Sequence, residues 1–423
     1  VGAGIDVPCL PDADGDLVFQ TMVSWATGSP ANGNNCTGRP DAYEAMLSNS
    51  KCKADSPISL PIDVLSRLVI EKQTIPGGLP DLFDFTGTIT DENGVPQAIT
   101  PFQLDDDGTA ELTGELDATY VITEAIPTGF EIDSIQCTNQ TTGAPANVTA
   151  NTATGEVTVV MSGSQFDVRC VYTNDQLPAT LTVVKEANGA NDVFNLFYGE
   201  SGQTPVAFSL ITANNTAQTS FDIESGLGGT FSVGEALTSS QLTAGWRIES
   251  AECVYDNAPT TPIGTVQRTG DDLIAVNGFT LNAGDSVTCT FVNNAAAQVT
   301  VTKVAQGGDD TFDFITDLPG GNFSLVTVGG SANTGPITLP IADSGNGVAV
   351  DILEAQQAGW TLVDITCSGT EETVSANLVQ FTAQPGDVID CTFTNAADGQ
   401  LTIVKETLGG DGPFGFITDV PGA

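Results

Sequence analysis

The chain has 423 residues, of which 53 are acidic and 11 basic, and it carries a formal net charge of −42 with no histidine. A charge of this sign repels nucleic-acid phosphates and anionic lipid, so we exclude nucleic acid as a partner. Because histidine is the commonest general base and metal ligand, its absence argues against catalytic triads and metal sites, and we expect no cofactor.

Short, alternating apolar runs separated by polar turns predict an all-β fold. No apolar run is long enough to span a bilayer, so we expect no direct membrane insertion. The chain begins at Val1 and contains nine cysteines. These features favour a processed protein that is exported to an oxidising compartment.

Residues 1–65 differ from the rest and are predicted to form a separate N-terminal unit. We expect a strand over residues 16–25, which alternates large apolar residues, and a short helix over residues 41–47. The unit holds three cysteines, Cys9, Cys36 and Cys52. One of the three must lack a partner within the unit, and we expect it, with Cys9 as the candidate, to bond another subunit.

Three acidic residues near the N-terminus, Asp12, Asp14 and Asp16, match the first three ligand positions of a calcium loop. The later glycine and the closing glutamate of such a loop are missing. We therefore interpret the segment as an ordinary acidic turn, with a calcium site as the alternative.

A five-residue strand ending in lysine occurs four times, at Leu68–Lys72, Leu181–Lys185, Val299–Lys303 and Leu401–Lys405. The chain has only six lysines, and four of them stand at this position. Alternation places each lysine on the same face as the apolar residues two and four positions before it, which is the face directed at the core. An ammonium group is unusual there.

Two further landmarks follow each of the first three lysines at nearly constant spacing. The first is a strand that ends in glutamate, 52, 50 and 51 residues after the lysine, at Glu124, Glu235 and Glu354. The second is a closing strand of the form Cys-x-aromatic-x-Asn, which ends at Asn174, Asn293 and Asn395. Each special residue is in phase with apolar or cysteine neighbours, so all three side chains of a set should point into one sandwich interior.

The repeats predict tandem β-sandwich domains over residues 66–177, 178–296 and 297–397, and an incomplete fourth repeat over residues 398–423. In the fourth repeat the sequence stops after two predicted strands, so Lys405 has no glutamate or asparagine to meet. Either the natural chain continues, or a neighbouring subunit supplies the missing strands. We favour the second interpretation, in which Lys405 lies at a head-to-tail joint of a homopolymer.

The lysine, glutamate and asparagine of one set can react with one another. The amine attacks the side-chain carbonyl carbon of asparagine, ammonia leaves, and an amide joins the two strands. Burial favours the neutral amine and the protonated acid, which polarises the carbonyl and carries the proton. The sets are Lys72/Glu124/Asn174, Lys185/Glu235/Asn293 and Lys303/Glu354/Asn395.

Two simpler interpretations need no reaction: a buried Lys–Glu ion pair capped by an amide, or unconnected surface residues. A buried pair loses several kcal/mol of hydration per ion, and apolar replacements are often as stable. Three such pairs in a lysine-poor chain would be a poor way to stabilise it, so we prefer the covalent interpretation.

The segment Tyr120–Phe130, with Glu124 at its centre, resembles the E-box of CnaB-type, or SpaA-like, prealbumin-fold domains of bacterial surface proteins and pilins. The resemblance covers about residues 66 to 397. It implies Ig-like sandwiches, each with an isopeptide bond from a first-strand lysine to a last-strand asparagine, promoted by the E-box glutamate. The second copy departs from the pattern by an insertion between Glu235 and Gly245, and the third by Val350 in place of an aromatic residue.

The remaining cysteines fit this frame, with one partner after a Gly-aromatic pair and one on the closing strand. We expect disulfides between Cys137 and Cys170, Cys253 and Cys289, and Cys367 and Cys391, with reduced buried pairs as the alternative.

These features predict an extracellular or cell-surface structural protein, a rod or pilus-like filament subunit, and no enzyme beyond its own crosslinking. One alternative is an adhesin stalk that presents the N-terminal unit to a host or environmental surface. The other is the repeat region of a larger exported protein, whose catalytic domain would lie beyond this sequence.

Overall fold

The computed structural model describes residues 17–26, 51–60, 65–91, 93–417 and 419. In the first two ranges it gives an antiparallel pair of strands, β1 (Leu17–Ala26) and β2 (Lys51–Leu60). The strand predicted over residues 16–25 is thereby confirmed, and β2, which contains Cys52, was not predicted. The helix expected over residues 41–47, Cys9, Cys36 and the acidic turn with Asp12, Asp14 and Asp16 lie outside the described residues.

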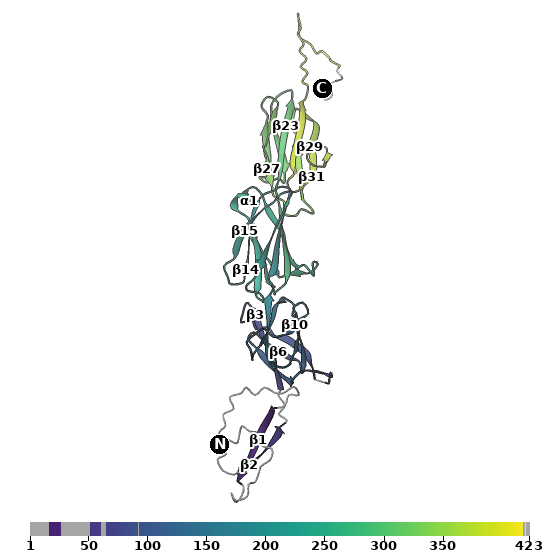
Figure 1. Cartoon of the computed structure of the whole chain (residues 1–423). Coiled ribbons are helices and arrows are strands. Elements are labelled where there is room, and N and C mark those ends of the chain that lie inside the picture. The colour runs from purple at the N-terminus through teal and green to yellow at the C-terminus, as the bar shows by residue number, and fades with distance from the viewer. Residues whose placement is uncertain (1–16, 27–50, 61–64, 92, 418, 420–423) are drawn as a thin grey trace, which may run out of the picture. The chain divides into compact units, whose positions relative to one another are not determined.

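Two sheets built from residues 65–176 enclose the first core (Figure 1). One sheet has the order β7 (Thr109–Glu115), β3 (Leu65–Ile75), β12 (Asp167–Gln176), β9 (Phe130–Asn139). The other has the order β10 (Val148–Asn151), β11 (Glu156–Val160), β8 (Thr119–Ala125), β4 (Phe83–Thr90), β5 (Pro96–Ala98), and β6 (Phe102–Leu104) also pairs with β4.

The second pair of sheets repeats this plan. One sheet has the order β16 (Thr216–Ile223), β13 (Ala179–Asn188), β22 (Ser286–Asn294), β18 (Arg247–Tyr255), β19 (Pro262–Ile263). The other has the order β15 (Val206–Ile211), β14 (Val193–Glu200), β17 (Thr230–Ala236), β21 (Leu273–Thr280), β20 (Thr265–Thr269).

The third pair of sheets encloses a core of its own. One sheet has the order β26 (Ser331–Asn333), β23 (Ala297–Gln306), β32 (Val388–Ala397), β29 (Trp360–Ser368), with β27 (Ile337–Leu339) also on β23. The other has the order β25 (Phe323–Val326), β24 (Thr311–Thr316), β28 (Val348–Glu354), β31 (Leu378–Ala383), β30 (Glu372–Ser375). The all-β prediction with tandem sandwiches is confirmed.

The first and last strands of a sandwich are neighbours in its sheet. Strand β12 runs parallel to β3, with Tyr172 opposite Lys72, and β32 runs parallel to β23, with Phe393 opposite Lys303. In the second sandwich β13 likewise lies beside β22. This adjacency brings lysine and asparagine, about 100 residues apart in sequence, to the same part of the core.

A β-bulge lies in the strand that pairs antiparallel with each closing strand. In β9, Cys137 lies opposite Cys170 and Ile132 lies opposite Asn174, so five residues of β9 span four of β12. The extra residue is Asp133 in β9. The corresponding extra residues are Glu249 in β18 and Val363 in β29. A bulge of one residue exchanges the two faces of a strand, so apolar residues on both sides of it face the core.

The insertion in the second sandwich forms the helix α1 (Ser239–Thr243). Thr238 caps it: its hydroxyl accepts from the Gln241 N–H, and its own N–H donates to the Gln241 side chain. The Gln241 amide also donates to the Val193 carbonyl, which attaches the insertion to β14. Within the described residues, no helix is long and apolar enough to cross a membrane.

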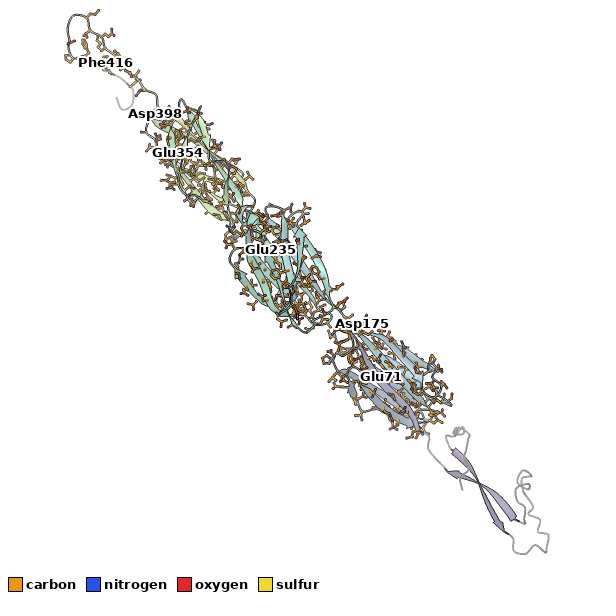
Figure 2. All side chains as sticks on the ribbon, turned by 90° about the vertical axis from the view of Figure 1, so that its left-hand side faces the viewer. Glu71, Asp175, Glu235, Glu354, Asp398 and Phe416 are labelled. Atoms are coloured by element: carbon orange, nitrogen blue, oxygen red, sulfur yellow. A yellow bond between two sulfur atoms is a disulfide. The ribbon has the colours of Figure 1, made fainter. Side chains whose placement is uncertain are left out.

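The strands predicted in the fourth repeat are not formed, and that prediction is wrong for this structure. Residues 401–405 and 414–416 have no strand, and Leu401, Ile403, Phe414 and Phe416 are more than half exposed (Figure 2). A strand needs a partner for its backbone hydrogen bonds, and these two short segments have no sheet to join. Alternating sequence alone is therefore insufficient here.

Candidate functional site

Each sandwich buries one lysine completely. Lys72 in β3, Lys185 in β13 and Lys303 in β23 are 0% exposed, as their in-phase apolar neighbours are. The three amino groups donate to the main-chain carbonyls of the closing strands, at 3.3 Å for Tyr172, 3.1 Å for Phe291 and 3.1 Å for Phe393. The predicted inward direction of these lysines is thus what the structure shows.

An aromatic ring from the opposite sheet covers each amine. The Nζ atoms lie 4.1, 4.5 and 4.4 Å from the ring centroids of Phe83, Phe194 and Phe312. Each ring in turn meets the aromatic residue of the Gly-aromatic pair edge-on, at centroid distances of 5.1, 5.1 and 5.2 Å for Phe130, Trp246 and Trp360. The ring attracts a cation and excludes water from it.

The contact of these phenylalanines with the lysines was not predicted from the sequence. The signal is the lysine-to-phenylalanine spacing, which is 11 residues in the first copy and 9 in the next three. The fourth lysine follows the same rule, because Lys405 Nζ lies 4.7 Å from the Phe414 centroid. Lys405 therefore keeps the aromatic partner of the other lysines although its segment is exposed and has no sheet.

The glutamate and asparagine of each set meet across the core. Asn174 Nδ2 lies 2.5 Å from Glu124 Oε1, and Asn395 Nδ2 lies 2.5 Å from Glu354 Oε1. Asn293 donates a similarly short hydrogen bond to Glu235. The glutamates come from β8, β17 and β28, and the asparagines from the closing strands of the facing sheets, so each bond joins the two sheets.

In the second and third sets the lysine also contacts the glutamate. Lys185 Nζ lies 3.5 Å from Glu235 Oε2, and Lys303 Nζ lies 3.5 Å from Glu354 Oε2. Even so, the side-chain carbonyl oxygen of each asparagine accepts no hydrogen bond, and neither does Glu124 Oε2 in the first set. Buried acceptors without donors are destabilising, so the arrangement is not explained as a network built for stability.

Burial controls the charge of these groups. Loss of hydration lowers the pKa of Lys72 and of Lys185 to about 8, although Glu124 and Glu235 oppose the shift. It also lowers the pKa of Lys303. For the same reason the pKa of each glutamate is raised, with the facing lysine as the opposing influence. Each site thus holds a nucleophilic amine, an amide carbonyl and a carboxyl group suited to carry a proton.

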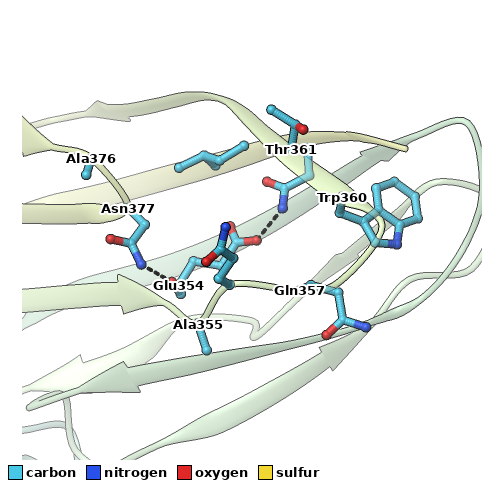
Figure 3. A pocket seen from close by; sticks show the side chains of 10 residues that line it. Glu354, Ala355, Gln357, Trp360, Thr361, Ala376 and Asn377 are labelled. Atoms are coloured by element: carbon cyan, nitrogen blue, oxygen red, sulfur yellow. Dashed lines mark hydrogen bonds between the residues drawn. The ribbon is translucent and has the colours of Figure 1, made fainter. Parts of the chain in front are cut away.

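The third site opens onto a cavity of about 450 Å³ lined by Glu354, Gln357, Trp360, Asn377 and Asn395, among others (Figure 3). Asn377 holds the glutamate backbone from both sides: its side chain donates to the Glu354 carbonyl at 2.6 Å, and its carbonyl accepts from the Glu354 N–H at 2.9 Å. Glu354 and Asn395 therefore form part of the wall of this cavity.

The structure contains the three disulfides expected on the sheets, Cys137–Cys170, Cys253–Cys289 and Cys367–Cys391. Each joins residues directly opposite each other on antiparallel strands. In all three the cysteine of the closing strand stands four residues before the asparagine.

Comparison with known proteins gives one family. A model for a prealbumin-like fold domain matches residues 68–176, 181–295 and 299–397. No curated protein sequence matches the chain.

Several solved structures match parts of the chain. The Bacillus anthracis TIE protein is 12% identical over 82% of this chain, with a TM-score of 0.34, and the match covers 54% of that protein, about half its length. A C-terminal fragment of the pilus adhesin SpaC from Lactobacillus rhamnosus GG is 12% identical over 80% of this chain and 100% of the fragment, with a TM-score of 0.30. The major pilin from Streptococcus pyogenes is 15% identical over 55% of this chain and 98% of that one, with a TM-score of 0.23.

The family model spans three consecutive segments, and each segment contains one buried Lys/Glu/Asn set between two sheets. The chain belongs to the family of prealbumin-like fold domains, of which it carries three in tandem.

Proposed function

We propose that the protein is an extracellular structural subunit, a rod or pilus-like stalk, in which each of the domains over residues 66–177, 178–296 and 297–397 is crosslinked internally by a Lys–Asn isopeptide bond. The observation that carries the proposal is the buried lysine, glutamate and asparagine set, repeated three times, in which the asparagine donates to the glutamate and the lysine donates to a carbonyl of the closing strand. The role requires no external substrate, because the reacting groups are side chains of the protein itself.

In the proposed reaction the neutral lysine amine attacks the asparagine side-chain carbonyl carbon. A new C–N bond forms, the bond to the asparagine amide nitrogen breaks, and ammonia leaves with a proton taken from the lysine. The glutamic acid lies within hydrogen-bond distance of the leaving nitrogen and carries that proton. Before the reaction, the side-chain carbonyl oxygen of the asparagine accepts no hydrogen bond.

A mechanical role follows from where the bond would lie in the chain. Tension that enters at the first-strand lysine leaves at the last-strand asparagine, so the strands between them carry no load. Only the 10 residues between Asn174 and Lys185 and the 9 residues between Asn293 and Lys303 remain in the load path. Such an array is suited to a stalk.

The intact mass of the reduced, denatured chain tests the crosslinks. We expect the mass computed from the sequence less three molecules of ammonia, and one ammonia fewer lost in each of Glu124→Ala, Glu235→Ala and Glu354→Ala. The exposed glutamates Glu131 and Glu252 provide matched controls, because Glu131→Ala and Glu252→Ala should keep all three losses. A wild-type chain at its full sequence mass would leave three buried ion pairs and overturn the proposal.

We propose further that copies join head to tail. The support is the segment around Lys405, which repeats the first-strand sequence, keeps the Phe414 contact and exposes its apolar residues. The same mass measurement examines this: covalent joining through Lys405 would give multiples of the chain mass that survive reduction, and Lys405→Arg would remove them. Only single-chain masses would contradict a covalent joint.

The rate of crosslinking should be nearly constant with pH in a middle window and fall on both sides. A neutral amine with a protonated carboxyl group holds as many protons as a charged amine with a carboxylate. The equilibrium between these two states is therefore independent of pH. Below the raised pKa of the glutamate both groups are protonated and the amine is not nucleophilic. Above about 8, the pKa of Lys72 and Lys185, the proton that the carboxyl group must carry is lost. Ammonia release from newly synthesised chains that fold for the first time at each pH, followed by mass, checks this profile; a rate that rises steadily above pH 8 would contradict it.

A further inference from the structure

The disulfides are placed in the same way relative to all three reactive sets. The cysteines of a pair face each other directly, with Cα atoms 4.0, 4.0 and 4.1 Å apart in the three sandwiches. One cysteine of each pair is on the closing strand, two residues before the aromatic residue whose carbonyl accepts from the lysine and four before the asparagine. Each disulfide therefore fixes the strand that carries the electrophile.

The bulge allows one strand to direct two residues at the core: the cysteine of the disulfide and the apolar residue opposite the asparagine. Cys137 and Ile132 stand five residues apart in β9, an odd number that in a regular strand would place them on opposite faces. With Asp133 as the extra residue, both are buried, at 8% exposure each. The same spacing holds for Ile248 with Cys253 and for Leu362 with Cys367.

Register decides whether the reaction is geometrically possible. A slip of one residue in the closing strand would turn the asparagine to the outer face, and a slip of two would bring a different residue to the lysine. In the first sandwich β12 must pair in this register with β3, whose residues are about 100 positions away in sequence. Pairing between segments so far apart in sequence is slow to form. The pairing of β12 with β9 is more local, with only 33 residues between the two cysteines, so a crosslink there sets the register early.

We propose that the cross-strand disulfide of each domain forms before the isopeptide bond and acts as its positioning device, so that crosslinking proceeds only after oxidation. The inference rests on the proposed function. Two thiols lose two electrons and two protons to a disulfide oxidant, and the asparagine strand is then locked in register. The lysine amine subsequently displaces ammonia as described, with no further redox change.

The test follows ammonia loss domain by domain in the full chain. The chain is synthesised and folded in the presence of a reducing agent, oxidised glutathione is then added, and proteolytic peptides are weighed over time. We expect ammonia loss on the order of 100-fold slower before oxidation, because a misplaced reacting group costs about that much. In the variant C137V/C170V the first domain should stay slow after oxidation, while the second and third domains accelerate as internal controls.

Hydrogen exchange of β9 and β12 separates positioning from folding. Slow crosslinking in a reduced domain whose strands are protected from exchange supports the proposal. Equal rates of ammonia loss before and after oxidation would overturn it, as would unprotected strands in the reduced domain, because the disulfide would then act by folding the domain. The reduced wild type retains every side chain, so it decides the matter even if C137V/C170V does not fold. Absence of ammonia loss in every arm would instead overturn the proposed function.

Discussion

Replacing Glu235 with glutamine should leave the second domain without its Lys185–Asn293 bond and lower its free energy of unfolding by about 4 to 5 kcal/mol, the loop-closure entropy of a loop of this size. A further loss comes from Lys185, which would stay buried without its acidic neighbour. Because the chain has several domains, the stability should be measured for β13 and β22 by hydrogen exchange in increasing denaturant.

The matched control for this variant is Glu252→Gln, which alters an exposed glutamate of β18 in the same domain. It should retain the ammonia loss and the protection of β22. If Glu235→Gln kept wild-type stability in the second domain, the lysine, glutamate and asparagine would not be joined by a bond that depends on that carboxyl group.

Stretching single molecules should show no unfolding extension from the three crosslinked domains and one large extension in Lys185→Arg. Without the bond, 108 residues separate positions 185 and 293, and the disulfide Cys253–Cys289 keeps 36 of them closed. The released length is then roughly 250 Å, before the folded span is subtracted, and roughly 370 Å once the disulfide is reduced. The disulfide thus limits the extension of a domain that has not crosslinked.

Lys405→Arg is the control in the pulling experiment, because Lys405 is exposed and lies outside the three sets. It should leave the extension record unchanged. A wild-type chain that extends by the length of a whole sandwich at moderate force would contradict the mechanical role.

Much of each site was predictable because period-two alternation is a strong constraint. Lys72 lies in phase with Leu68 and Ile70, and Asn174 lies in phase with Cys170, so their inward direction followed from the sequence and is what the structure shows. Constant spacing then indicated that the members of a set lie together. The disulfide partners followed from the same frame.

The features that were not predicted are those at which the period-two alternation of apolar residues is interrupted. The bulge residue Asp133 has no distinctive side chain, and its signal is the seven-residue step from Phe130 to Cys137, which is odd although both residues face the core. The helix α1 was recorded only as an insertion, although Thr238 and Gln241 have the spacing of a capping box. In the fourth repeat the error was the reverse: the alternation was present, but no partner strand was.

The scarcity of lysine has a consequence for proteolysis. Between Arg268 and Lys405 the only basic residue is Lys303, which is fully buried. An isopeptide bond would convert that side chain to a neutral amide, so an enzyme that cleaves after lysine or arginine would find no usable site anywhere in the third domain. The nearest arginine before the third domain is also engaged, because Arg268 donates to the carbonyls of Ile248 and Glu249. Because the lysine that would form the isopeptide bond is also the only basic residue of the third domain, crosslinking would make this domain resistant to trypsin-like digestion.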